Sequence, residues 1–259
     1  MRIAMGIEYD GTNYVGWQLQ DNGPSVQGVV EEALAQVANH PLRITCAGRT
    51  DTGVHALGQV VHFDTEVERS ERSWVFGCNA NLPKDVAVTW ARPVDDNFHA
   101  RFSARHRRYR YVIFNRPVRP TFLAYRVSWE YRTLDETRMA KAAQFLLGEH
   151  DFNAYRAVGC QSKTPVRRID SIEIRRKDDI ITIDIEANAF LHHMVRNIAG
   201  VLMTIGAGEQ AEDWTRQILE TRDRTQGGIT APPHGLYLVD VDYAPDYDLP
   251  RVLDTHMIW

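Results

Sequence analysis

The sequence feature that most constrains the fold is a mixture of strand-like and helix-like segments, recurring in similar order in both halves of the chain. Alternating or continuous apolar residues predict strands, and apolar residues at helical spacing predict helices. In the first half the predicted strands are 3–9, 43–46, 59–63 and 86–91, and the predicted helices are 26–37 and 73–81. Ser25 is a suitable N-cap for the first of these helices.

The second half repeats this mixture after a crossover segment near residues 95–104. Its predicted strands are 107–115, 168–175, 180–186 and 236–243, and its predicted helices are 135–147, 190–205 and 211–220. Strands and helices that share one half without a strict βαβ alternation favour an α+β fold. We therefore predict two related α+β lobes, 1–104 and 105–259, with a catalytic loop in the first.

Composition is that of an ordinary globular protein, and 259 residues can bury a substantial core. No apolar run is long enough to span a membrane, and the first residues read as a strand rather than a signal peptide. The three cysteines, Cys46, Cys78 and Cys160, are far apart and have no metal-ligand spacing. These features predict a cytoplasmic protein with reduced thiols and no membrane partner.

A net charge of −4 argues against a generic nucleic-acid coat, but the charge is unevenly distributed. Residues 97–129 contain no Asp or Glu. The cations of this stretch are Arg101, Arg105, Arg107, Arg108, Arg110, Arg116, Arg119, Arg126, His99 and His106. Interleaved aromatic residues are Phe102, Tyr109, Tyr111 and Phe114. This pattern fits phosphate contact with base stacking; the alternative is an Arg-rich surface strand that aids solubility.

A carboxylate in a polar loop is the strongest candidate for chemistry. Asp51 lies between Gly48 and Gly53, with Arg49 two residues before it and a strand-like run after it. Loops held by a rigid scaffold often carry catalytic groups, and a carboxylate can act as nucleophile or base. A plain Asx turn is one alternative. An aspartic protease is another, but that chemistry needs two carboxylates and the chain has one Asp-Thr-Gly.

Residues 48–51 (Gly-Arg-Thr-Asp) and 53–56 (Gly-Val-His-Ala) together resemble the catalytic motif of the TruA family of tRNA pseudouridine synthases. Three further blocks resemble that family in the same order: 107–111, 188–197 and 231–238. The resemblance covers the chain from Ile3 to Tyr243. It implies a pseudouridine synthase fold, in which two ferredoxin-like halves with mixed or antiparallel sheets flank a central catalytic cleft.

The resemblance also implies an activity, the isomerisation of uridine to pseudouridine at positions 38, 39 and/or 40 of the tRNA anticodon stem-loop. Asp51 would be the catalytic aspartate, since a carboxylate can attack or accept a proton and then leave. Three first steps stay open: attack on the uracil ring, attack on the anomeric carbon, or removal of a sugar proton. No cofactor or metal is expected, and the family is homodimeric.

Four other residues match substrate-binding positions of the family. Tyr109 would stack on the target base, although Tyr111 lies on the same strand face by spacing and is easily confused with it. Arg196 would pair with the catalytic carboxylate, and Arg49 would lie near the target nucleotide. Leu236 would line the base pocket. Each also has an ordinary structural explanation, as a core residue or a surface arginine.

Contacts to the RNA backbone are predicted for the basic residues beside these motifs: Arg105, Arg107, Arg108, Arg110 and His55. The pair His192-His193 raises the question of a metal. On the predicted helix 190–205 neighbouring side chains point about 100° apart. No nearby Cys or acid completes a tetrahedral set, so no metal is predicted.

Two rival functions remain in view. One is an RNA-binding module in which Asp51 is only structural, and the other is a single-Asp hydrolase or aspartic-protease-like enzyme. Replacement of Asp51 by Asn distinguishes them, because a synthase would keep its tRNA binding but lose isomerisation. A binding module would be unaffected, and a protease would lose peptide cleavage.

Overall fold

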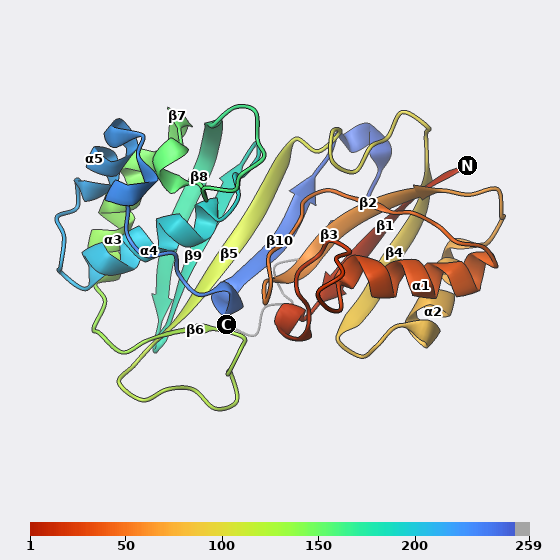
Figure 1. The fold of residues 1–259 in the computed structure, drawn as a ribbon, viewed down its shortest axis with the longest axis horizontal. Helices are drawn as coiled ribbons and strands as arrows, with labels where there is room; N and C mark the ends of the chain where they lie inside the picture. Colours follow the sequence, from red (N-terminus) through yellow and green to blue (C-terminus); the bar gives the residue numbers. More distant parts are fainter. Residues whose placement is uncertain (252–259) are drawn as a thin grey trace. The chain divides into compact units, whose positions relative to one another are not determined.

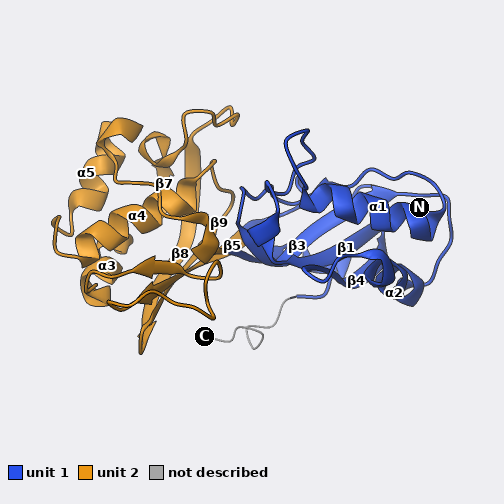
Figure 2. Cartoon of the chain, turned by 60° about the horizontal axis from the view of Figure 1, so that its bottom comes forward, with its two compact units in different colours: residues 1–106, 237–258 blue, residues 107–236, 259 orange. Residues whose placement is uncertain are grey.

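A computed structural model describes residues 1–251, which form two compact units (Figure 2). Unit 1 comprises residues 1–106 and 237–251, and unit 2 comprises residues 107–236. The sequence prediction had a single boundary at 104/105, whereas the chain leaves unit 2 again after Leu236. The last strand of the predicted second lobe therefore belongs to unit 1. Residues 252–259 of that predicted lobe lie outside the described part of the chain.

Unit 1 is built on a mixed sheet, with the spatial order β4-β1-β3-β10 and β2 paired to β3 (Figure 1). The strands are β1 (Arg2–Tyr9), β2 (Thr45–Cys46), β3 (His55–Asp64), β4 (Val86–Val94) and β10 (Leu236–Asp242). β1 runs antiparallel to β3 and β4, and β10 runs parallel to β3 with Tyr237 opposite His55. β1 and β3 are buried almost throughout, which explains their near-continuous apolar sequence.

The two helices of unit 1 are α1 (Val26–Ala38) and α2 (Glu71–Asn81), which pack against each other. Ser25 caps α1 as predicted, because its side chain accepts a hydrogen bond from the Gly28 N–H. Ser70 caps α2 in the same way, and α2 also packs against β4.

In unit 2, the strands β5, β9, β8 and β7 follow one another in the sheet. The strands are β5 (His106–Asn115), β6 (Ser128–Glu130), β7 (Gly148–Asp151), β8 (Val166–Lys177) and β9 (Ile180–Ala187). These pairings are antiparallel, and only β6 adds to β5 in parallel. The predicted β8–β9 hairpin is present, with its turn at Asp178, whose φ is 53°.

Three α-helices complete unit 2: α3 (Glu136–Ala143), α4 (Met194–Gly206) and α5 (Trp214–Thr221). α3 packs against α4 and β8, and Asp135 caps it. It ends earlier than predicted, because a 3-10 turn follows at Gln144–Leu146. The predicted α+β class with mixed sheets is confirmed, and no helix in residues 1–251 is long and apolar enough to cross a membrane.

Candidate active site

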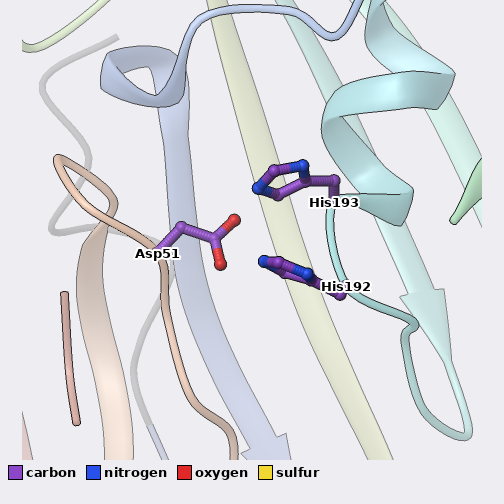
Figure 3. A group of neighbouring side chains, drawn as sticks. All are labelled: Asp51, His192 and His193. Carbon is purple, nitrogen blue, oxygen red and sulfur yellow. The ribbon is translucent and has the colours of Figure 1, made fainter. Parts of the chain in front are cut away.

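Asp51 lies in the loop between β2 and β3 of unit 1, and Figure 3 shows its side chain projecting from that loop. The loop is fixed by backbone bonds to a segment far away in sequence. Gly16 forms an isolated bridge with Asp51, and the Trp17 N–H donates to the Thr50 carbonyl at 3.0 Å. The Val54 N–H donates to the Asp51 carbonyl at 3.1 Å and closes a turn. Asp51 is thus a half-buried carboxylate whose main chain is held on both sides.

Side chains strengthen this clamp around the residues next to Asp51. The Thr52 hydroxyl donates to the Val15 carbonyl at 2.9 Å, and the Tyr9 hydroxyl lies 2.7 Å from the Thr50 hydroxyl in a buried hydrogen bond. Gly16 has a φ of 115°, and a Cβ there would lie 2.8 Å from the Thr50 carbonyl oxygen. The close approach of the two segments therefore depends on glycine.

His55 is the first residue of β3 and is 2% exposed. Its Nδ1 lies 3.0 Å from the Gly11 N–H nitrogen and 3.1 Å from a carboxylate oxygen of Asp10, and its ring stacks on Tyr237. The prediction that His55 contacts RNA phosphate does not fit this placement. Burial between Gly11 and Tyr237 makes His55 a residue that fixes the end of the loop.

Arg49 is exposed at the start of the same loop. Its charge acts on Cys46 of β2, together with that of Arg101. Burial raises the pKa of the Cys46 thiol to about 12, and the two guanidinium groups oppose that rise. Arg49 and Arg101 therefore both lie close enough to the Cys46 sulfur for their charges to affect it.

In unit 2, Tyr109 and Tyr111 occupy β5 and are both buried. The Tyr111 hydroxyl donates to the Pro232 carbonyl at 2.8 Å, and burial raises its pKa. Tyr109 instead packs edge-on against Phe190, with ring centroids 4.9 Å apart. The Tyr111 hydroxyl thus bonds to the main chain of unit 2, whereas the Tyr109 ring packs against Phe190. The two tyrosines, which the sequence spacing could not tell apart, therefore differ in their surroundings.

Arg196 lies in the first turn of α4. Its Nε donates to the Ala231 carbonyl at 2.8 Å, and the Ala231 N–H donates back to the Arg196 carbonyl at 3.1 Å. Leu236 is 6% exposed and follows Gly235, at which a Cβ would lie 2.6 Å from the Val112 carbonyl oxygen. α4, the 231–236 segment and β5 are therefore tied together within unit 2.

His192 and His193 precede α4 rather than lying on it (Figure 3). His193 has a φ of 61°, so the predicted helix 190–205 begins only at Met194. The two rings are tilted against each other with centroids 4.0 Å apart. The predicted separation of about 100° between the two side chains is therefore wrong, because it assumed that both residues lie on the helix and His193 instead has left-handed backbone before it. The absence of a metal stays a prediction.

The basic residues predicted to contact RNA differ in their surroundings. Arg110 is 9% exposed, and its Nε donates to Asp184 at 2.6 Å, which makes it a buried ion pair of the sheet rather than an RNA contact. Arg107 donates to the Asn188 carbonyl at 3.0 Å. Arg105 is exposed and Arg108 is half-buried.

Sequence reasoning missed the residues that hold the loop, above all Tyr9, Gly11 and Gly16. A Cβ on Gly11 would lie 2.0 Å from the Val54 carbonyl oxygen, so this glycine permits the contact between the loop and the end of β1. The available signal was a pair of glycines in the polar segment 10–16. Nothing local connected that segment with Asp51.

Comparisons with known proteins agree with this picture. A family model described as tRNA pseudouridine synthase matches residues 5–103 and 142–244. Relatives named tRNA pseudouridine synthase A include a Coxiella burnetii protein, 57% identical over 97% of this chain and 96% of its own. A Pseudomonas aeruginosa protein is 57% identical over 99% and 91%, and a Nitrosococcus oceani protein is 56% identical over 100% of both chains.

Among solved structures, a chain of a Cbf5-Nop10-Gar1 complex matches with a TM-score of 0.39 and 11% identity, covering 78% of this chain and 45% of that one. The sequence relatives align with this chain over nearly the whole of their own length. They share one name, which is that of an isomerase. The chain therefore belongs to the tRNA pseudouridine synthase A family, the TruA family whose motifs its sequence resembles.

Proposed function

We propose that this protein isomerises uridine to pseudouridine at positions 38, 39 and/or 40 in the anticodon stem-loop of tRNA, with Asp51 as the catalytic carboxylate. One observation carries the assignment to Asp51. The two residues that flank it, Thr50 and Thr52, are bonded to the 15–17 segment, and its own carbonyl accepts from Val54. A loop fixed this way presents its one acidic side chain in a defined direction.

Such fixation matters because a catalytic group must be held close to its productive geometry before the substrate arrives. The isomerisation breaks an N-glycosidic bond and forms a carbon–carbon bond to the same base. A carboxylate can serve as nucleophile or as base and can then leave. All three first steps remain compatible with this loop: attack on the ring, attack on the anomeric carbon, and removal of a sugar proton.

Residues of unit 2 take the roles that the family resemblance assigns. Tyr109 stacks on the target base, Arg196 pairs with the catalytic carboxylate and Leu236 lines the base pocket. Arg49, on the Asp51 loop itself, acts near the target nucleotide. The exposure of Arg49 supports its part of the proposal.

Phosphate contacts are proposed for Arg105, Arg107 and Arg108, at the acid-free junction where the chain enters unit 2. Their charge fits recognition of RNA by shape and backbone contact. Arg110 is left out because Asp184 neutralises it. We also propose that the protein works in the cytoplasm as a homodimer, which sedimentation velocity would test.

The test is carbodiimide labelling with primer extension on an unmodified tRNA transcript, treated with wild type, Asp51→Ala and Asp51→Asn. New stops in the anticodon arm with wild type alone are expected. Stops that persist with both variants would show that another group is the catalyst. Unmodified tRNA after wild-type treatment, despite binding, would favour the RNA-binding module.

A matched control is Asp21→Asn, which changes an exposed acidic residue of another loop of unit 1. Its activity should equal that of wild type. Loss of activity in Asp21→Asn as well would mean that the assay reports charge or folding rather than the chemistry of Asp51.

A further inference from the structure

The segment before β5, residues 96–103, is tightly anchored in unit 1. Phe98 is fully buried and packs against Tyr243 and Tyr247, and the Tyr243 hydroxyl donates to the Ala100 carbonyl at 2.7 Å. The Arg2 guanidinium donates to the Phe98 carbonyl at 2.8 Å. This part of the chain is therefore rigid, although it has no regular secondary structure.

His99 organises the turn that follows. Its imidazole Nδ1 accepts from the main-chain N–H groups of Arg101 and Phe102 at 3.2 and 3.3 Å. The main-chain N–H of His99 donates to the Ser103 hydroxyl at 2.9 Å. The Ser103 N–H returns to the His99 carbonyl at 2.8 Å. Five consecutive residues are thus locked by their own hydrogen bonds.

Neutral imidazole is needed for this arrangement, because only an unprotonated Nδ1 accepts hydrogen bonds. Burial, with the nearby charges of Arg2 and Arg101, lowers the pKa of His99. His62 behind it accepts from the Ala100 N–H at 3.1 Å, and the two imidazole rings lie 4.7 Å apart. The turn is therefore held in one state at neutral pH.

This rigid turn presents Phe102 to solvent with 75% of the residue exposed. One face of the ring rests on His99, with centroids 4.3 Å apart and planes tilted by 31°. The Arg101 guanidinium lies 5.6 Å from the ring centroid. Among the aromatic residues interleaved with the arginines of residues 101–116, Tyr109, Tyr111 and Phe114 are buried, whereas Phe102 is open to solvent.

Arg101 places a positive charge beside the Phe102 ring. Arg101 follows His99 in the turn, and Arg49 of the Asp51 loop reaches the same thiol of Cys46 as Arg101 does. Residues 97–129 contribute no acid. An exposed ring in a cationic setting, in the unit that carries Asp51, suits an anionic polymer with flat apolar bases.

We propose that Phe102, supported by His99 and flanked by Arg101, is a platform on which an unpaired base of the tRNA substrate stacks. The proposal rests on the proposed function and adds a binding site outside the residues assigned there. Bases in loops and at opened pairs need such surfaces, because they have lost their own stacking partners. Stacking tolerates any base, so the platform contributes affinity and register rather than sequence choice.

The experiment measures binding of a fluorescein-labelled, unmodified tRNA transcript by anisotropy at several salt concentrations, together with isomerisation. Phe102→Ala should weaken binding about 5- to 100-fold. Phe102→Trp should stay within about twofold of wild type, because it restores an aromatic face. The salt dependence should be unchanged in Phe102→Ala, while Arg101→Gln, which removes the cation beside the ring, should lower its slope by about 1.

Phe76 provides the matched control. It is 59% exposed on α2 of the same unit, with the Arg72 guanidinium 4.4 Å from its ring centroid. Phe76→Ala removes another exposed aromatic beside an arginine and should leave binding unchanged. A loss in both variants would point to a nonspecific effect and overturn the platform.

Other outcomes also decide the proposal. Wild-type affinity in Phe102→Ala, with normal isomerisation in the wild type, refutes the platform and leaves the proposed function standing. A wild type that neither binds nor isomerises tRNA refutes both. If Phe102→Ala changes the sedimentation of the protein alone, the ring belongs to a contact between copies of the chain, and the RNA platform is overturned.

Discussion

The Asp51 loop in unit 1 and the start of α4 in unit 2 both carry family motifs, but different bonds hold them. The loop is clamped mainly through main-chain groups, with Trp17 bonded to Thr50 and Gly16 bridged to Asp51. The start of α4 also has a main-chain bond, from the Ala231 N–H to the Arg196 carbonyl, but it relies more on side chains. Asn197 donates to the Tyr155 carbonyl at 2.8 Å and accepts from the Thr230 hydroxyl at 2.6 Å.

This difference determines which substitutions each segment tolerates. A loop held by its main chain can change the side chain at its tip without losing its shape, but it cannot accept bulk where the two segments touch. A helix start that relies on buried side-chain hydrogen bonds, such as those of the Asn197 amide, is sensitive to the loss of that side chain.

Asp51→Ala should have the largest effect on function and a small effect on folding. We expect isomerisation to fall by about 10³-fold or more. The free energy of unfolding should change by less than about 1 kcal/mol, because the main-chain clamp does not use the carboxylate. Urea unfolding and the carbodiimide assay measure the two quantities. A large loss of stability would show that the side chain helps to build the loop.

Gly11→Ala should do the reverse and break the clamp without touching the chemistry directly. The new Cβ would lie 2.0 Å from the Val54 carbonyl oxygen, so the end of the Asp51 loop must move. We expect a cost of about 3 kcal/mol and a loss of activity as well. Gly159→Ala is the control, because nothing lies within 4 Å of that position. Equal stability of the two variants would contradict the clamp.

The contrast also explains how far the sequence could predict the structure. Ser25 capped its helix as expected, and the β8–β9 hairpin turned where predicted, because both signals are local. The start of α4 was misplaced because His193 adopts left-handed backbone, which the apolar pattern does not reveal. The pairing of β10 with β3 depends on a contact between distant parts of the chain.

The same limit applies to the candidate site. The loop of Asp51 and its neighbours could be found from a motif, whereas its supports could not. Tyr9 and Gly16 are ordinary residues in sequence, and only the fold brings them to Thr50. A charge pattern likewise does not reveal burial. The sequence therefore predicted an RNA contact for Arg110, whereas the fold places Asp184 beside it.

Asn197→Ala tests the side-chain anchor of unit 2. Asn197 is 2% exposed, and its loss leaves the Tyr155 carbonyl without its donor and Thr230 without its acceptor. We expect destabilisation of about 2 kcal/mol by urea unfolding. Asn81→Ala removes a single exposed bond to Gly77 and should cost less than about 0.5 kcal/mol. Similar costs for both would show that the buried amide is not an anchor.

Acid should weaken unit 1 through His62. Burial, aided by His99 and Arg2, lowers the His62 pKa from 6.5 to about 4. The unfolded chain therefore takes up a proton that the folded chain refuses. The stabilisation is complete above about pH 6.5 and is lost as pH falls toward about 4, by at most about 1.4 kcal/mol per pH unit.

Urea unfolding between pH 7.5 and 5 measures this loss, and His62→Asn should flatten the dependence. Asn can still accept a hydrogen bond from the Ala100 N–H, which His62 binds, but it cannot be protonated in this range. Identical slopes for wild type and variant would remove His62 from the explanation.

Tyr9→Phe should have the smallest effect and gives the finest test of the clamp. It removes the buried hydroxyl that lies 2.7 Å from the Thr50 hydroxyl and leaves the ring contact with Trp17 in place. We expect a cost of about 1 kcal/mol, the usual net value of one hydrogen bond. Because main-chain bonds still hold Thr50, isomerisation should fall by less than about tenfold. A drop as large as that of Asp51→Ala would mean that this hydroxyl, rather than the main chain, sets the direction of the carboxylate.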